Sequence, residues 1–258
     1  MRPEKELAQP YKHLSALRMM LAALSLLFAM TSADAVAVLL NSPSACSVRT
    51  YEVAMETVKK EAAAGKPLQQ FVIGVTTDDK ALAKRYIEAS RGRIRYLAAH
   101  KNNPLAWYLL SLEANDLKLL RKAAAGGNVQ ALNALGTLAT SEAFDKKNGV
   151  STNRIETILK KSFDYFRKAA MQRDSNGFIN LGTCYLRGFG CQQDMALAFE
   201  CFKSAAEAGH PEGMDNVSAC YQFGHGVAPN AEQSLFWAMR GRAARGDAAA
   251  AKWLRERK

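Results

Sequence analysis

Apolar residues recur every three or four positions along most of the chain, and short glycine-containing segments interrupt this pattern. Between Ser175 and Arg187 an apolar stripe contains Phe178, Leu181 and Tyr185, with Cys184 beside it. Such spacing is typical of a helix that buries one face. The pattern therefore predicts a chain built of amphipathic helices.

A shift of 36 residues superposes one helical segment on another. Residues 177–190 and 213–226 then agree at six positions: Gly177/Gly213, Asn180/Asn216, Cys184/Cys220, Tyr185/Tyr221, Gly188/Gly224 and Gly190/Gly226. A third segment, residues 131–137, repeats the Leu-Gly-Thr of residues 181–183 at a spacing of 46 and has a longer connection. A fixed period of this length indicates a repeat architecture.

Each unit is predicted to be a helical hairpin. The first helix, Ser175 to Arg187, should end at Gly188, because glycine readily adopts the left-handed conformation that closes a helix. Asp194 should cap a second helix that runs to Gly209, and His210 with the following proline opens the next hairpin. Short hairpins cannot bury their apolar faces alone, so the units must stack.

Two further helix termini are predicted outside this unit. Asn153 and Glu156 have the spacing of a capping box at the start of a helix. Residues 248–258 should form a C-terminal helix that caps the stack, with Trp253 and Leu254 on one side and basic residues elsewhere.

The repeated residues resemble the Sel-one-like repeat, a relative of the tetratricopeptide repeat. The matching residues of one copy are Leu181-Gly182, Tyr185, Gly188, Gly190, Asp194, Ala198, Ala205-Ala206 and Gly209. Departures include Cys191 where valine is usual, Cys201 where tryptophan is usual, and Ser218 for glycine. The resemblance implies an all-α fold, a right-handed α-solenoid of stacked hairpins. It implies about three repeats in residues 122–247 and helical, degenerate repeats in residues 36–121.

The N-terminal segment has the features of a secretory signal peptide. Residues 19–30 are apolar except for Ser25, and Ala33-Asp34-Ala35 provides a small-x-small cleavage site. The preceding basic residues are Arg2, Lys5, Lys12 and Arg18. We expect residues 1–35 to be removed and a bacterial protein to be periplasmic or secreted; the alternative is an N-terminal helix that stays. No apolar run approaches the length of a mature membrane anchor, so no stable membrane insertion is expected.

The charge is strongly positive, +11 over 258 residues. Basic residues concentrate in residues 80–101, 146–168 and 240–258. Such faces could bind anionic glycans or lipids, although solvated helix surfaces have the same composition. No motif of a nucleic-acid reader is present, and no nucleic-acid partner is expected.

The chain has five cysteines, of which four lie in the repeat region. If two helices run antiparallel about a turn near residue 209, Cys201 faces residues 217–218 and comes within one turn of Cys220. A Cys201–Cys220 disulfide is therefore the first choice. The alternative, and the more frequent outcome, is thiols buried at core positions.

The sequence predicts no catalytic site, metal or cofactor. Cys-x-x-Cys and His-x-x-x-His spacings are absent. A disulfide-rich group of these repeats has been linked with β-lactam hydrolysis, so the resemblance leaves a cell-wall or β-lactam-directed hydrolase as an alternative. The Ser-x-x-Lys, Ser-Asp-Asn and Lys-Thr-Gly motifs of serine acylases are nevertheless absent.

A binding surface for a protein or peptide is the remaining prediction. Polar residues of the first helix fall on one stripe beside the apolar face. In tetratricopeptide-type solenoids this side lines a concave groove, and by that resemblance the stripe is expected to bind a partner. The predicted groove residues are Asn176, Asn180, Thr183, Arg187, Asn216 and Phe223. The alternative for each residue is a solvated surface.

Overall fold

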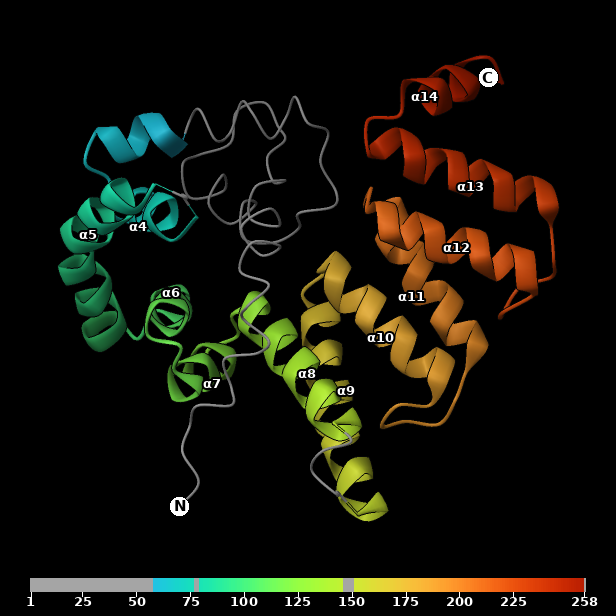
Figure 1. Cartoon of the computed structure of the whole chain (residues 1–258). Coiled ribbons are helices and arrows are strands. Elements are labelled where there is room, and N and C mark those ends of the chain that lie inside the picture. Colours follow the sequence, from blue (N-terminus) through green and yellow to red (C-terminus); the bar gives the residue numbers. More distant parts are fainter. Residues whose placement is uncertain (1–57, 77–78, 146–150, 258) are drawn as a thin grey trace.

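The computed structural model describes residues 58–76, 79–145 and 151–257, and all regular secondary structure within them is helical (Figure 1). After a short helical segment at residues 58–63, the helices are α4 (Pro67–Thr76), α5 (Lys80–Lys101), α6 (Pro104–Ala114), α7 (Leu117–Ala125), α8 (Val129–Phe144), α9 (Thr152–Met171), α10 (Ser175–Arg187), α11 (Met195–Glu207), α12 (Pro211–Phe223), α13 (Ala231–Ala244) and α14 (Ala248–Arg255). The predicted leader, residues 1–35, lies outside the described residues.

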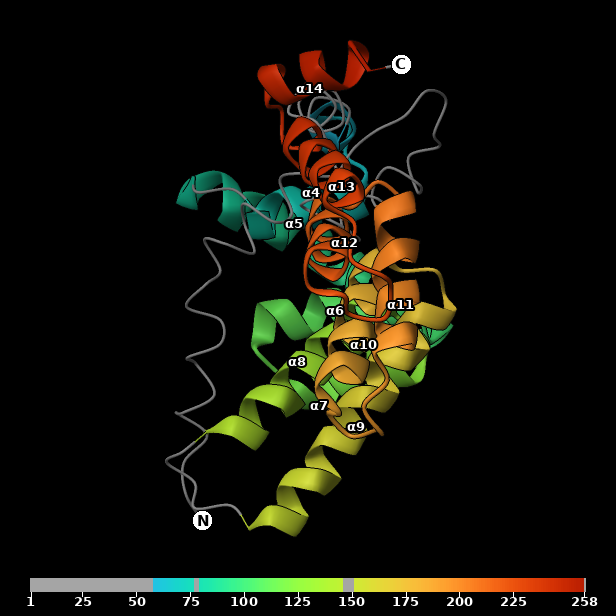
Figure 2. The same cartoon turned by 90° about the vertical axis from the view of Figure 1, so that its right-hand side faces the viewer.

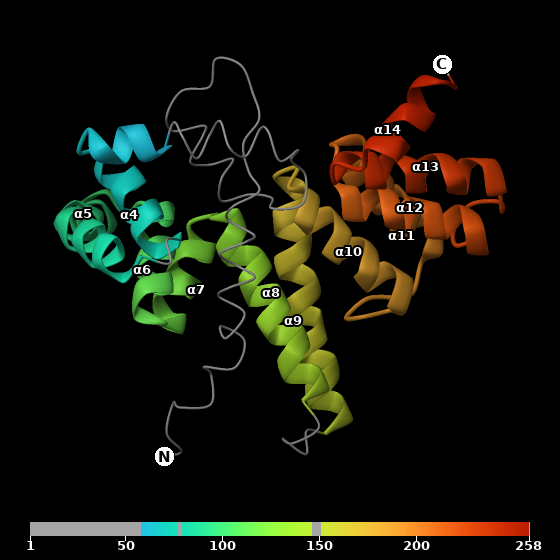
Figure 3. The same cartoon turned by 45° about the horizontal axis from the view of Figure 1, so that its top comes forward.

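Consecutive helices pack in pairs, and the pairs follow one another along a curved row. The pairs are α4 with α5, α6 with α7, α8 with α9, α10 with α11, and α12 with α13. Figures 1 and 3 show the row passing from α4 and α5 at one end, through α8 and α9, to α13 and α14 at the other. The predicted all-α solenoid is confirmed.

Most helices begin at a side chain that caps the first backbone amides. In α10 the Asp174 carboxylate accepts from the Gly177 amide at 2.7 Å, and in α11 Asp194 accepts from Leu197 at 2.9 Å. Helix α9 differs, because its cap residue is Ser151 and makes no side-chain capping bond. The predicted capping box at Asn153 and Glu156 is therefore wrong, since α9 begins two residues earlier than that box requires.

Glycines within the first helices allow the two helices of a pair to approach closely. A Cβ atom at Gly182 would lie 2.7 Å from the Phe202 ring of α11, and one at Gly136 would collide with Phe166 of α9. The Leu-Gly motif of the repeat thus provides space for an aromatic ring of the second helix. Phe202 and Phe166 are both buried.

The Gly-x-Gly loops pack against the preceding hairpin. Gly190 and Gly226 adopt φ angles of 71° and 74°, which side chains rarely tolerate. A Cβ atom at Gly190 would collide with the Leu159 carbonyl of α9, and one at Gly226 with the Met195 carbonyl of α11. Each loop therefore joins its own hairpin to the one before it.

The four described cysteines are free, and the predicted Cys201–Cys220 disulfide is not formed. Cys201 packs with Cys184 and Cys191 against α9 and α10, whereas Cys220 belongs to the next apolar cluster, with Phe202 and Trp237. The antiparallel register was predicted, but the two thiols lie on different faces of their helices. Burial raises the pKa of Cys184 to about 12 and that of Cys220 to about 11.

Candidate partner-binding face

The first helices of successive hairpins form one side of the solenoid. Helix α8 contacts α10, and α10 contacts α12, whereas the second helices α9, α11 and α13 contact one another less. The helices α8, α10 and α12 therefore follow one another along one side of the solenoid, and Figure 2 shows the stack from a second direction.

Equivalent residues recur on these helices at fixed distances from the cap residue. We call the positions two, six, nine and thirteen residues after the cap the inner row. In α10, which follows Asp174, these residues are Asn176, Asn180, Thr183 and Arg187. In α12, which follows His210, they are Glu212, Asn216, Ala219 and Phe223.

Asn180 and Asn216 occupy the same inner-row position and are both half-buried. Neither side chain makes a hydrogen bond with another described residue. A carboxamide has an acceptor oxygen and two donor hydrogens, so each can bond to both the N–H and the C=O of a peptide backbone. These two amides are the best-placed polar groups for a ligand on this side.

Arg187 and Phe223 hold the equivalent positions at the C-terminal ends of α10 and α12. The Arg187 side chain is exposed and forms no ion pair within the described part of the chain. Phe223 is 63% exposed, and its ring lies 5.8 Å from the ring of His225. Together they give this end of the row one cationic and one aromatic group.

Asn176 and Thr183 already use polar atoms within the protein. The Asn176 Oδ1 lies 3.2 Å from His210 Nε2, which connects α10 with the start of α12. The Thr183 hydroxyl donates to the Ile179 carbonyl at 3.0 Å. The structure therefore gives these two predicted groove residues internal contacts.

Helices α8 and α14 extend the inner row beyond the residues predicted from the sequence. Counting from the cap residue Asn128, the row on α8 contains Gln130, Thr137 and Ser141. In α14 the position of Asn216 is held by Trp253, whose ring lies 4.2 Å from the Arg257 guanidinium carbon. The Leu-Gly-Thr motif shared by α8 and α10 aligns the two helices, and this alignment would have identified the α8 residues from the sequence.

Two buried polar residues join the first helices at their N-terminal ends. Asp174 accepts a hydrogen bond from Asn133 Nδ2 of α8 at 2.7 Å, and burial raises its pKa although its hydrogen bonds oppose this. His210 is fully buried. Burial lowers the pKa of His210 to about 4, with a further lowering by Arg245 and an opposing effect of Asp215.

No group of three or more His, Cys, Asp or Glu side chains suited to a metal ion occurs in residues 58–76, 79–145 and 151–257. Within the same ranges no helix has the length and apolar character needed to cross a bilayer.

The family model of the Sel1 repeat, the motif that the sequence resembles, matches residues 117–128, 159–174, 179–210 and 211–238. No curated protein matches the chain. A solved Sel1 repeat protein from Oxalobacter formigenes is similar at 24% identity and a TM-score of 0.43, over 50% of this chain and 90% of its own. A protective antigen of uropathogenic Escherichia coli with an SLR fold is similar at 19% identity and a TM-score of 0.34, over 82% of this chain and 53% of its own.

Proposed function

We propose that this chain is a Sel1-like repeat protein and a non-catalytic scaffold that holds an extended segment of a partner protein along its inner row. Sel1 repeats generally mediate protein interactions. The observation that carries the proposal is the pair of equivalent carboxamides, Asn180 and Asn216, neither of which is bonded to another described residue.

The chemistry of the row fits a peptide backbone with one side-chain anchor. An extended peptide presents unpaired N–H and C=O groups along its length, and repeated amides satisfy them without reading sequence. Arg187 can bind a carboxylate of the partner in a two-point contact. Phe223 holds the equivalent position on α12 and offers an apolar contact, since most of its side chain is exposed.

Site-specific photo-crosslinking in native extracts tests this proposal. A photoreactive amino acid in place of Asn216 should crosslink to a discrete partner. The same group in place of Glu200, which is exposed on the second helix α11, should not give this adduct. An equal adduct from both positions would mean that the partner does not use the inner row.

The crosslinked segment can then be made as a synthetic peptide and its affinity measured. Each lost side-chain hydrogen bond is worth about 1 kcal/mol and each amide can make two, so Asn180→Ala with Asn216→Ala should weaken binding by up to about 1,000-fold. Gln222→Ala is the matched control, because that amide is exposed on α12 but lies off the row. The proposal fails if the control weakens binding as much as the double variant.

We also propose that the protein acts outside the cytoplasm. The basic, apolar and small-residue regions of residues 1–35 support this location. N-terminal sequencing of the protein recovered from the periplasm or medium should give a chain that starts at Val36. Recovery from the cytoplasm with residues 1–35 intact would contradict this location and leave the peptide-binding proposal unaffected.

The non-catalytic part of the proposal has a direct assay. The purified protein should not turn over nitrocefin or release fragments from peptidoglycan. Turnover that survives rigorous purification would favour the hydrolase alternative.

A further inference from the structure

The three basic stretches of the sequence differ in how their charges are compensated. On α9, Lys160 pairs with Glu156 and Arg167 with Asp164. Near the C-terminus, Arg242 pairs with Asp247, Arg245 with Asp215 and Lys252 with Glu256. Helix α5 has seven basic residues and one acidic residue, Glu88, and no ion pair within the helix.

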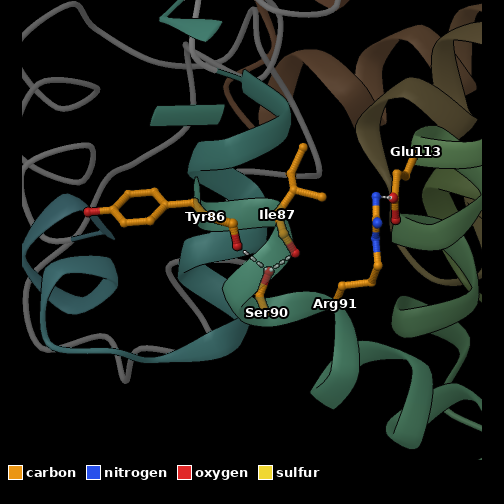
Figure 4. Close-up of polar contacts among 5 residues, drawn as sticks. All are labelled: Tyr86, Ile87, Ser90, Arg91 and Glu113. Carbon is orange, nitrogen blue, oxygen red and sulfur yellow. Dashed lines mark hydrogen bonds and ion pairs between the residues drawn. The ribbon is translucent and has the colours of Figure 1, made fainter. Parts of the chain in front are cut away.

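Among the described residues, one basic side chain of α5 has an acidic partner. Arg91 forms an ion pair with Glu113 of α6, and Figure 4 shows it reaching across from α5 while Ser90 bonds to the backbone of its own helix. The other six basic residues are exposed and have no ion pair in the described part of the chain. These residues, which we call the α5 basic face, are Lys80, Lys84, Arg85, Arg93, Arg95 and Lys101.

This concentration of charge opposes the stability of the helix. Lys80 and Lys84 are four residues apart, as are Arg91 and Arg95, and like charges at that spacing repel. In α9, α11 and α14 a lysine forms an ion pair with an acid four residues away, whereas Lys84, which lies four residues before Glu88, forms none with any described residue. The basic face of α5 is therefore unlike the other exposed helix surfaces of this solenoid, and the fold does not need it.

The rest of the exposed surface of α5 narrows the class of partner. Between the basic residues lie small side chains, Ala81, Ala89, Gly92 and Ala99, which let a flat surface approach closely. The helix has no Asn, Gln or Thr, and its single serine is fully buried. It therefore lacks the Asn and Gln amides that read adenine and the aliphatic hydroxyls that bind sugars, and its charged groups suit phosphates.

The one exposed aromatic residue of α5 does not serve as a stacking platform for a base. Tyr96 stacks on His100 with ring centroids 4.5 Å apart, and the Arg93 guanidinium carbon lies 5.3 Å from its centroid. Tyrosine beside basic residues is common where proteins meet the polar region of a bilayer.

We propose that the α5 basic face binds an anionic phospholipid surface peripherally. The helix is about 33 Å long, and at about 100° per residue Lys84, Arg85 and Arg95 fall within about 100° of its circumference, so one plane can contact these three at once. Its apolar residues, including Ile94 and Ala98, are buried in the core and cannot insert into the bilayer. Attraction between basic side chains and lipid headgroups is sufficient for such binding. This surface is separate from the inner row, so the proposal does not depend on peptide binding.

Vesicle sedimentation with the full chain tests the proposal. The protein should bind vesicles of phosphatidylcholine with about one third phosphatidylglycerol, and should not bind phosphatidylcholine alone, at about 0.1 M salt. Each basic residue near such a surface contributes about fivefold in affinity, so Lys84→Gln, Arg85→Gln and Arg95→Gln together should weaken binding about 100-fold. The thermal midpoint of this variant should not fall, because like-charge repulsion is relieved.

A control variant with the same net charge separates this face from the overall charge of the protein. Lys161→Gln, Lys168→Gln and Arg255→Gln remove three exposed basic residues outside α5 and should change vesicle binding less than threefold. Equal loss in the two variants would overturn the proposal, as would failure of the wild-type chain to bind the anionic vesicles. Binding of a single-stranded oligonucleotide through α5, without vesicle binding, would assign the face to nucleic acid instead.

Discussion

Protonation of His210 should destabilise the solenoid in mild acid. The imidazole is fully buried at the start of α12, and its pKa falls from the usual 6.5 to about 4 in the folded protein. Because the folded pKa is lowered, the unfolded chain takes up a proton before the folded one does. The contribution of His210 to the free energy of unfolding is therefore fully present above about pH 6.5 and is lost as the pH falls from 6.5 toward 4.

The size of the effect follows from the shift. Each pKa unit corresponds to about 1.4 kcal/mol, so the full loss below pH 4 is about 3 kcal/mol. Between about pH 7.5 and pH 5 the loss from this one group is about 2 kcal/mol. Asp215 attracts the imidazolium and Arg245 repels it, and burial outweighs both.

Urea denaturation of the wild type and of His210→Asn at the two pH values measures this contribution. Asparagine is chosen because Asn128 caps α8 at the equivalent position, through its Oδ1 and the Ala131 amide at 2.9 Å. The wild type should lose about 2 kcal/mol more than the variant between pH 7.5 and pH 5. His225→Asn is the control, since that side chain is not buried, and it should keep the wild-type difference. Parallel losses in the wild type and His210→Asn would refute the reasoning.

Three further predictions concern the loops, the caps and the thiols. Gly226→Ala should lower the free energy of unfolding by about 2 kcal/mol or more, because it adds a collision with the Met195 carbonyl to backbone strain. Gly209→Ala, whose Cβ atom would meet nothing within 4 Å, should lower it by only about 1 kcal/mol. Equal losses in urea denaturation would contradict the loop packing. Asp174→Ala should lower the free energy of unfolding by about 2 kcal/mol in the same assay, since it removes a helix cap and leaves Asn133 Nδ2 without its acceptor. Asp194→Ala removes only a helix cap, so an equal loss in the two variants would argue against the link between Asp174 and Asn133. In a Cys46→Ser chain, a thiol reagent should label half-buried Cys191 before buried Cys184 and Cys220, and mass spectrometry that finds the reverse order would show the cluster to be open.

Local signals account for the part of the fold that could be predicted from the sequence. The first helix of the best repeat, Ser175–Arg187, was predicted with its observed bounds from its apolar stripe and from Gly188 at its C-terminal end, and the structure adds Asp174 as its N-terminal cap. Caps and left-handed glycines act within a few residues, so a single sequence contains them. The predicted start of α9 was wrong, because Asn153 and Glu156 have the spacing of a capping box although the observed cap residue is Ser151. Ser151 makes no side-chain capping bond, so no capping pattern in the sequence indicates the true start.

The errors arose where the outcome depends on which face of a helix meets which neighbour. Cys201 and Cys220 belong to different apolar clusters, because the rotation of each helix about its axis decides whether two thiols meet and sequence spacing does not give that rotation. The contact of Asn176 with His210 joins residues 34 positions apart. In the same way, the sequence shows seven basic residues in α5 but not that, within the described part of the chain, Arg91 is the one that pairs with a carboxylate, 22 residues away.

The two buried polar links explain why the inner row can act as one surface. Asn133 of α8 reaches Asp174 at the start of α10, and Asn176 of α10 reaches His210 at the start of α12. Both links join a first helix to the residue where the next first helix begins, and that residue fixes the register of the inner row that follows. Asn180 and Asn216 each lie six residues after such a link. A buried polar group that loses its partner raises the free energy of the folded state. These links therefore oppose sliding of one first helix past the next and hold the spacing between the two amides.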